Sequence, residues 1–240
     1  IFLAIGLLWL FRNPSYEKID KAFIQASDSL IKKEIPAFNL NFLVDKVAYS
    51  EPVYFPNGVE TADFTEHLEA INHENAIEYL KELIGAKSEI SEWNIKGLHQ
   101  LVLKGIDDKN AGRYRNHDVI ISGAQHRPPQ YIKVPELMEK LIMNYYEWDK
   151  YHPIVRSALL HGELVKIHPF VDGNGRTSRL IINMELMRSG YVPVIIKKDN
   201  RLKYYETLDK AHTIGDYTDF VKLVTEAENE MLDRYLSVVE

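Results

Sequence analysis

Apolar residues recur at intervals of three and four along most of the chain. One such pattern begins with Phe64, Leu68 and Ile71 and continues through Gly85. Residues at this spacing share one face of an α-helix, so the pattern predicts a helix with one buried side. The sequence therefore indicates a mainly α fold. The same spacing predicts two helices within 15–49, which Pro36 separates, and further helices at about 91–106, 134–151, 153–167, 175–189, 203–212 and 217–238.

The segment 113–129 departs from this helical spacing. Three β-branched residues, Val119, Ile120 and Ile121, are followed by Gly123, and the pair Pro128-Pro129 closes the segment. β-Branched residues between turn-forming residues are typical of strands. The pattern predicts a short β-hairpin flanked by loops.

Proline and glycine divide the chain near its first quarter. Pro52, Pro56 and Gly58 punctuate the stretch 50–59, which we interpret as a connector. We therefore expect an N-terminal helical extension at 1–58 and one larger domain at 59–240.

The first eleven residues are strongly apolar and end at Arg12. A helix needs about 20 apolar residues to span a bilayer, so this stretch is too short for a complete span. A buried or dimer-forming helix is the favoured interpretation. The remnant of a longer membrane anchor or of a signal segment is the alternative.

Composition excludes several classes of function. The formal net charge is −6 and the pI is about 5.9, which lacks the basic surface that neutralises a nucleic-acid backbone. We expect no nucleic-acid partner. The chain has no cysteine, so disulfides, thiolate zinc sites and cysteine nucleophiles are absent, and a reducing, cytoplasmic location is the expectation.

A glycine-rich turn between two predicted helices carries the candidate chemistry. One helix ends at Ile167 and the next starts near Gly175, so free backbone N–H groups and a positive helix end surround Gly173-Asn174-Gly175. Such a turn is an anion site. Arg176 and Arg179 lie one turn apart on the second helix, where two guanidinium groups can bind the phosphates of a nucleotide.

Two further residues of the turn complete a nucleotide-transfer site. Asp172 precedes the glycines, where a carboxylate can hold Mg²⁺ on phosphate oxygens. His168 opens the turn, and a histidine can take a proton from a hydroxyl near neutral pH. Each residue alone is more often a packed histidine, a capping acid or a solvated arginine. Their combination in one glycine turn favours phosphoryl or nucleotidyl transfer.

The run from His168 to Arg179, HPFVDGNGRTSR, resembles the full signature of the Fic family of nucleotide-transferring enzymes. The similarity extends from about Glu69 to the C-terminal helix. The resemblance implies a helical bundle with a β-hairpin flap over the active loop, within a catalytic domain at 59–240. It further implies transfer of AMP from ATP, with Mg²⁺ or Mn²⁺, to a Ser, Thr or Tyr hydroxyl of a target protein or of the enzyme itself. By this resemblance His168 is the catalytic base and Asp172 is the metal ligand. Gly173, Asn174 and Gly175 form the phosphate cradle, and Arg176 and Arg179 contact phosphates. Asn174 and Arg176 are also expected to be catalytic residues.

Other segments are similar to parts of the same family. The stretch 111–121 resembles the lead-in and flap, so a target protein is expected to dock near Val119–Gly123 as an added strand. Tyr204 and Tyr205 resemble a tyrosine pair that borders the adenine pocket, although two tyrosines on a helix are more often core residues. His212 stands where several relatives carry Asn, so an adenine contact there is not expected to carry over.

Many relatives carry a self-inhibiting Ser/Thr-x-x-x-Glu-Gly/Asn helix, whose glutamate pairs with the second arginine, here Arg179. No intact copy occurs in this sequence: Thr65 and Glu69 have the spacing, but Ala70 follows. Either the enzyme is unrestrained, or the inhibitory element lies outside these residues or in a partner.

Several alternatives remain open from the sequence. Removal of AMP by the same loop is a close rival, and it would use the inhibitory glutamate. Kinase-type phosphate transfer is the second alternative, but it goes with a lysine-containing variant of the loop. Transfer from a phosphocholine donor is the third, and it depends on the shape of the pocket. A non-catalytic peptide-binding module is the fourth, and it would leave His168 and Asp172 without a role. Zinc protease and deaminase chemistry lack their ligand sets around His73 and His161. A homodimer through the apolar N-terminus is a further expectation.

Overall fold

The computed structural model describes residues 64–239 of the chain. The helices predicted within 15–49, the extension at 1–58 and the connector at 50–59 lie outside these residues. Within 64–239 the chain is mainly helical and contains no strand. The elements are α4 (Phe64–Gly85), α5 (Glu92–Val102), η1 (Tyr131–Lys133), α6 (Val134–Glu147), η2 (Trp148–Lys150), α7 (Pro153–Ile167), α8 (Asn174–Arg188), η3 (Lys198–Asn200), α9 (Arg201–Ile214) and α10 (Thr218–Val239).

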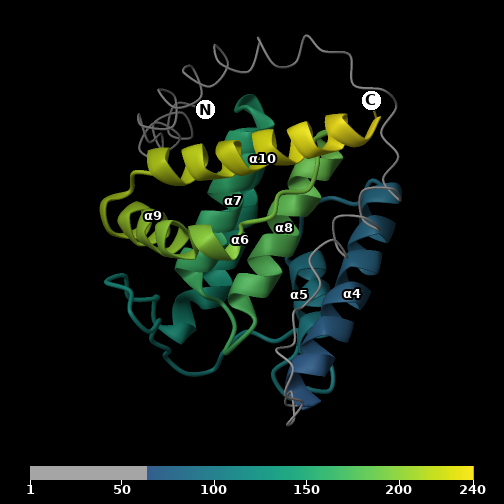
Figure 1. Cartoon of the computed structure of the whole chain (residues 1–240). Coiled ribbons are helices and arrows are strands. Elements are labelled where there is room, and N and C mark those ends of the chain that lie inside the picture. Colours follow the sequence, from purple (N-terminus) through teal and green to yellow (C-terminus); the bar gives the residue numbers. More distant parts are fainter. Residues whose placement is uncertain (1–63, 240) are drawn as a thin grey trace, which may run out of the picture.

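Helices α7 and α8 form the centre of the fold (Figure 1). The helix pair α4 and α5 packs on one side of α8, whereas α6, α9 and α10 pack against α7. Every helix predicted between 64 and 239 is confirmed, with ends that differ by a few residues. The α-helical class is therefore confirmed by the structure.

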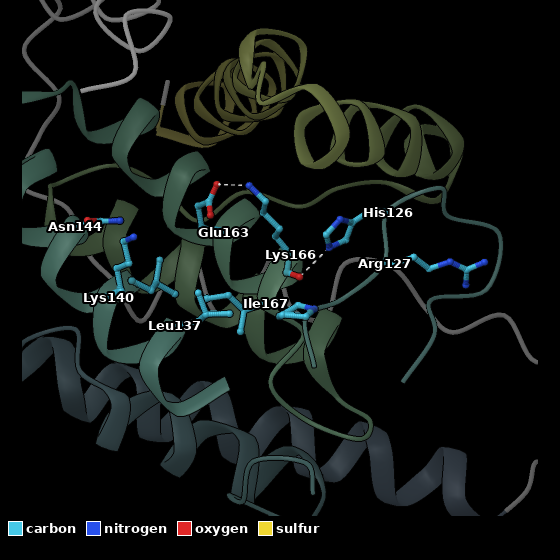
Figure 2. Close-up of a pocket in the computed structure, with 10 residues that line it drawn as sticks. His126, Arg127, Leu137, Lys140, Asn144, Glu163, Lys166 and Ile167 are labelled. Carbon is cyan, nitrogen blue, oxygen red and sulfur yellow. Dashed lines mark hydrogen bonds and ion pairs between the residues drawn. The ribbon is translucent and has the colours of Figure 1, made fainter. Parts of the chain in front are cut away.

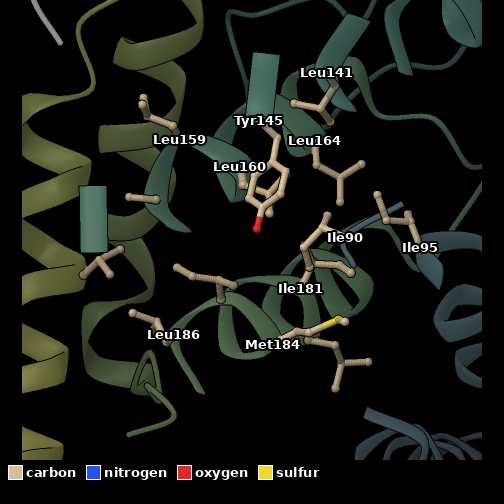
Figure 3. Packing of buried hydrophobic residues seen from close by; sticks show 14 of the residues in the cluster. Ile90, Ile95, Leu141, Tyr145, Leu159, Leu160, Leu164, Ile181, Met184 and Leu186 are labelled. Carbon is tan, nitrogen blue, oxygen red and sulfur yellow. The ribbon is translucent and has the colours of Figure 1, made fainter. Parts of the chain in front are cut away.

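The core lies where α7 and α8 face each other and the helices around them. Figure 3 shows its centre, in which Leu159, Leu160 and Leu164 of α7 meet Ile181 and Met184 of α8. All five side chains are at most 3% exposed. Burial of apolar side chains contributes about 1.5–3 kcal/mol each, so this contact fixes the two helices that carry the ends of the glycine turn.

No described helix combines the length and the apolar character that a membrane crossing requires.

The predicted β-hairpin at 113–129 is not present as strands; this segment is an irregular loop between α5 and η1. Side chains hold its backbone in place of a strand ladder. The N–H groups of Gln125 and His126 donate to the Asp209 carboxylate of α9, at 3.0 and 2.8 Å, and the N–H of Tyr131 donates to Asp118 at 2.8 Å. These contacts fix the C-terminal part of the loop, and the β-branched run 119–121 has no partner strand among the described residues.

Gly162 of α7 allows Tyr217 to pack against the helix. A Cβ atom at Gly162 would lie 2.3 Å from Cε1 of Tyr217, whose side chain is fully buried. We predict that Gly162→Ala lowers the free energy of unfolding by about 1–3 kcal/mol, the usual cost of overpacking a core. Gly85→Ala is the matched control, because no heavy atom lies within 4 Å of its Cβ position. Urea denaturation measures both variants, and equal stabilities would show that Tyr217 moves aside freely.

Glu228 of α10 is a buried carboxyl group. It is 1% exposed, and one oxygen accepts the N–H of Val192 at 3.1 Å. The other oxygen has no hydrogen-bond partner among the described residues. Burial raises the pKa of Glu228 to about 8, more than the Val192 hydrogen bond lowers it.

This carboxyl group makes stability depend on pH. The folded state holds the proton more tightly than the unfolded state, so stability is lost as pH rises from about 4.5 to about 8. We predict that Glu228→Gln removes this loss and raises stability at pH 8 by on the order of 3 kcal/mol. Melting temperatures across this pH window test the prediction, with Glu226→Gln as an exposed control on the same helix. Parallel pH curves for Glu228→Gln and the unsubstituted protein would contradict it.

Candidate active site

The loop 168–173 reverses the chain between α7 and α8. His168 ends α7 in the left-handed conformation with φ 49° and ψ 60°, and Gly173 precedes α8 with φ 75°. A left-handed non-glycine residue costs about 1–2 kcal/mol, so contacts must hold His168 in this conformation. Its N–H donates to Leu164 at 3.0 Å, and its carbonyl accepts a hydrogen bond from Arg115 at 2.9 Å.

Asn174 closes the loop from inside. Its side-chain oxygen accepts the N–H of Phe170 and its NH₂ group donates to the carbonyl of the same residue, both at 2.9 Å. Asn174 is 3% exposed, and the Ser178 hydroxyl donates to the backbone carbonyl of Asn174 at 2.7 Å. The sequence predicted Asn174 as a catalytic and phosphate-binding residue; in the structure its amide is engaged with the loop backbone and shapes the turn.

His99 of α5 holds the loop from the other side. Its ring stacks on Phe170, with centroids 3.6 Å apart and planes 5° apart. Nδ1 accepts the N–H of Gly112 and Nε2 lies 2.9 Å from the carbonyl of Asp172, so the proton resides on Nε2. Burial lowers the pKa of His99 to about 4, and the ring is neutral at physiological pH.

Sequence reasoning missed His99. It lies on the buried face of α5 among apolar residues, where a histidine is an exception that signals a specific polar contact. Those apolar residues are Ile95, Leu98 and Val102.

The charged residues of the loop lie together at its mouth. The Asp172 carboxylate, 67% exposed, pairs with Arg176 at 2.9 Å. Arg176 also pairs with Glu69 of α4 at 2.9 Å. Glu69 belongs to the incomplete inhibitory motif, and the structure brings it to the first arginine of the loop.

Arg179 lies one turn further along α8 and faces the same side. Burial, and next the charge of Arg179, lowers the pKa of His73 on α4; Arg176 adds to this effect. Within 64–239 no carboxylate forms an ion pair with Arg179. Both arginines therefore lie between α4 and the start of α8, where the charge of Arg176 is balanced by Asp172 and Glu69.

The N-terminus of α8 presents backbone donors to this region. No side chain caps it, and its first backbone bond inside the helix is from Thr177 to Gly173 at 2.9 Å. The N–H groups of Asn174, Gly175 and Arg176 therefore have no helical partner. Together with the two guanidinium groups they form an anion-binding surface.

The His168 side chain is mostly buried beside this surface. Burial lowers its pKa to about 4, and the charges of Arg115 and His126 add to this effect, whereas the Val165 carbonyl and Asp172 raise it. Among the described residues its Nδ1 has no hydrogen-bond partner of good geometry. The ring is therefore a neutral proton acceptor at physiological pH.

The two candidate adenine-binding tyrosines differ in environment. Tyr204 is 5% exposed, and its hydroxyl bonds to Nε2 of the buried His161 at 2.9 Å. Tyr205 is 51% exposed. His212 is buried, with Nε2 at 2.9 Å from the carbonyl of Gly162. Of these three side chains, only Tyr205 is open to a ligand in this structure.

A hollow of about 320 Å³ adjoins the loop on the side away from α8. Figure 2 shows its wall, where the Nε2 atom of His126 bonds to the carbonyl of Lys166 at 2.9 Å. Ile167, the residue directly before His168, is part of its lining. Its lining comes from the 113–130 loop, α6 and α7, and consists of His126, Arg127, Pro129, Leu137, Lys140, Leu141, Asn144, Glu163, Lys166 and Ile167.

The helical fold and this loop define a class of site in which a histidine, a glycine turn, a helix N-terminus and two arginines follow one another closely in the chain. Comparison with known proteins identifies the family. Residues 89–186 match the model of the Fic/DOC family. Fic-1 (residues 134–508) of C. elegans superposes with a TM-score of 0.74 at 28% identity, over 94% of this chain and 74% of that structure.

Curated relatives give the same result. Protein adenylyltransferase Fic of Drosophila virilis is 39% identical over 180 residues, which are 74% of this chain and 36% of that protein. The protein of the same name from Nematostella vectensis is 34% identical, over 93% of this chain and 58% of its own length. This chain belongs to the Fic/DOC family. It spans about a third of the Drosophila relative and somewhat over half of the Nematostella one.

The Asn174 amide provides a test of how the loop is held. We predict that Asn174→Ala lowers the free energy of unfolding by about 2–4 kcal/mol, because it leaves the buried N–H and carbonyl of Phe170 without partners. Asn75→Ala, on the exposed face of α4, is the control. Urea denaturation measures both, and similar stabilities would show that water replaces the amide.

Proposed function

We propose that this chain transfers AMP from ATP to a Ser, Thr or Tyr hydroxyl of a protein, itself included. One observation carries the proposal: a neutral His168 opens the short loop 168–173, and the helix that follows this loop starts with free N–H groups and two arginines. Membership of the Fic/DOC family and the names of the curated relatives support the same reaction.

The geometry supports a direct displacement at the α-phosphorus. The neutral ring of His168 takes the proton of the acceptor hydroxyl, whose oxygen bonds to the α-phosphorus. The bond from that phosphorus to the bridging oxygen breaks, and pyrophosphate leaves. The N–H groups at the start of α8 and the guanidinium groups of Arg176 and Arg179 hold the phosphate charge in place, which is the main source of catalysis in such transfers.

Asp172 fits a metal site of the kind that nucleotides use. Mg²⁺ commonly binds through one or two carboxylates and the substrate phosphates, and Asp172 presents a single exposed carboxylate beside the anion surface. We infer that Asp172 holds Mg²⁺ or Mn²⁺, which neutralises phosphate charge when bound. Asp172 is also paired with Arg176. When phosphate binds, Arg176 therefore exchanges the Asp172 carboxylate for a phosphate oxygen.

The acceptor protein has a natural approach along the 113–130 loop. Ile120 is 73% exposed within the expected docking segment Val119–Gly123, and an incoming extended segment could pair with its backbone.

We place the catalytic unit at 59–240. In the described part of the chain no carboxylate pairs with Arg179, which favours transfer over removal of AMP.

His168→Ala tests the proposal. Incubation with ATP labelled at the α or the γ phosphate, with Mg²⁺, is followed by mass spectrometry of the protein and of a cell extract. We expect α label on protein, a fall of about 10²–10⁴-fold in His168→Ala and unchanged ATP binding, because the substitution removes the base and no phosphate contact.

The control is His152→Ala, at the opposite end of α7. Label from the γ position alone would indicate a kinase. Absence of both labels from the unsubstituted protein would contradict AMP transfer, and release of AMP from a modified protein would then identify the reverse reaction.

A further inference from the structure

Arg115 connects the 113–130 loop to the candidate active loop. Its side chain is fully buried, and its Nε donates to the carbonyl of His168 at 2.9 Å. Nη1 donates to the carbonyl of His117 at 3.0 Å, and Nη2 donates to the carbonyl of Pro129. Its backbone N–H donates to Pro169 at 2.9 Å. One residue thus contacts both ends of the loop 116–129 and two consecutive residues of the active loop.

The geometry requires a guanidinium group. Its planar fork directs several N–H groups at fixed angles, whereas a lysine ammonium is a compact charge that cannot reach three separated carbonyls at once. The Asp118 carboxylate lies 3.6 Å from Nη1 but is 62% exposed. The buried charge is therefore held mainly by carbonyl dipoles, which this arrangement aligns.

These contacts act on the two features that make His168 useful. The hydrogen bond to the His168 carbonyl supports the left-handed backbone that directs its side chain. Pro129 and Ile167 both line the hollow beside the active loop, and Arg115 binds Pro129 on one side and the residue after Ile167 on the other. The position of the loop 116–129 relative to His168 thus depends on Arg115.

We propose that Arg115 is a positioning residue that couples the acceptor-docking loop 116–129 to the base His168. The proposal rests on the function proposed above. Arg115 acts through backbone carbonyls, and its fully buried side chain is closed to nucleotide and acceptor. It sets where the base lies relative to a docked hydroxyl.

Arg115 also has an electrostatic effect that a purely structural residue would lack. Burial is the largest cause of the low pKa of His168; the charges of Arg115 and His126 lower it further, and Asp172 and the Val165 carbonyl oppose them. Removal of the Arg115 charge therefore raises the pKa of His168. The labelling rate falls at low pH because His168 becomes protonated. With a higher pKa, this fall, the acid limb of the pH–rate profile, moves to higher pH.

Three variants separate these effects. Arg115→Lys keeps the charge and loses the fork, Arg115→Met loses both, and Arg113→Met is the control, because Arg113 is exposed two residues away. The rate of self-labelling from α-labelled ATP with Mg²⁺ is measured against pH, and the Kd of ATP is measured by calorimetry. Amide hydrogen exchange of 116–130 and 164–172 supplies a readout that needs no activity.

We expect both Arg115 variants to label about 10- to 100-fold more slowly, as for a misplaced base, with the Kd of ATP changed less than about twofold. The acid limb should move to higher pH in Arg115→Met and stay in place in Arg115→Lys. Exchange should accelerate in both segments together in the two Arg115 variants and in neither segment of Arg113→Met.

Other results would overturn the coupling. Unchanged rates in Arg115→Met, a rate loss that follows weakened ATP binding, or faster exchange in 116–130 alone would each contradict it. If the unsubstituted protein takes up no α label, the proposed AMP transfer fails, and the exchange measurement still decides whether Arg115 couples the two loops.

Discussion

The two hydrogen bonds between the Asn174 amide and the backbone of Phe170 are the constraint on which the site depends. They close the turn between α7 and α8 in a few residues. This brings the end of one helix, where His168 lies, against the start of the next, where free N–H groups are available. The large apolar contact between α7 and α8 holds the helices, but only the closed turn brings His168 close to the start of α8.

Buried polar side chains surround this turn, and each has a specific partner. His99 bonds to Gly112 and Asp172, and Arg115 bonds to the carbonyls of His117, Pro129 and His168. Burial without partners would cost several kcal/mol per group, so these contacts specify one arrangement of the loop. Burial also keeps His99 and His168 neutral, as the proposed proton transfer to His168 requires.

Much of the fold followed from the spacing of apolar residues. The predicted helices between 64 and 239 are confirmed, because a helix with one buried face repeats its pattern over many residues. The hairpin predicted at 113–129 is not shown by the structure, in which this segment has no strands. Its β-branched residues favour extended backbone, but strand formation needs a partner strand, and contacts from Asp209 and Arg115 take its place. Asp209 lies more than 80 residues further along the chain, so local preference does not reveal its contacts.

The sequence by itself determined which residues gather at the candidate active loop, since His168, Asp172, Arg176 and Arg179 are close in the chain and a glycine turn between helices forces their backbones together. The tertiary structure alone decided which other elements reach that loop. His99, Arg115 and Glu69 lie roughly 50–110 residues before it, and no periodicity links them to it. It also decided that Tyr204 is buried against His161 while Tyr205 is exposed, because neighbouring residues on a helix point in different directions and only packing determines which of them faces the core.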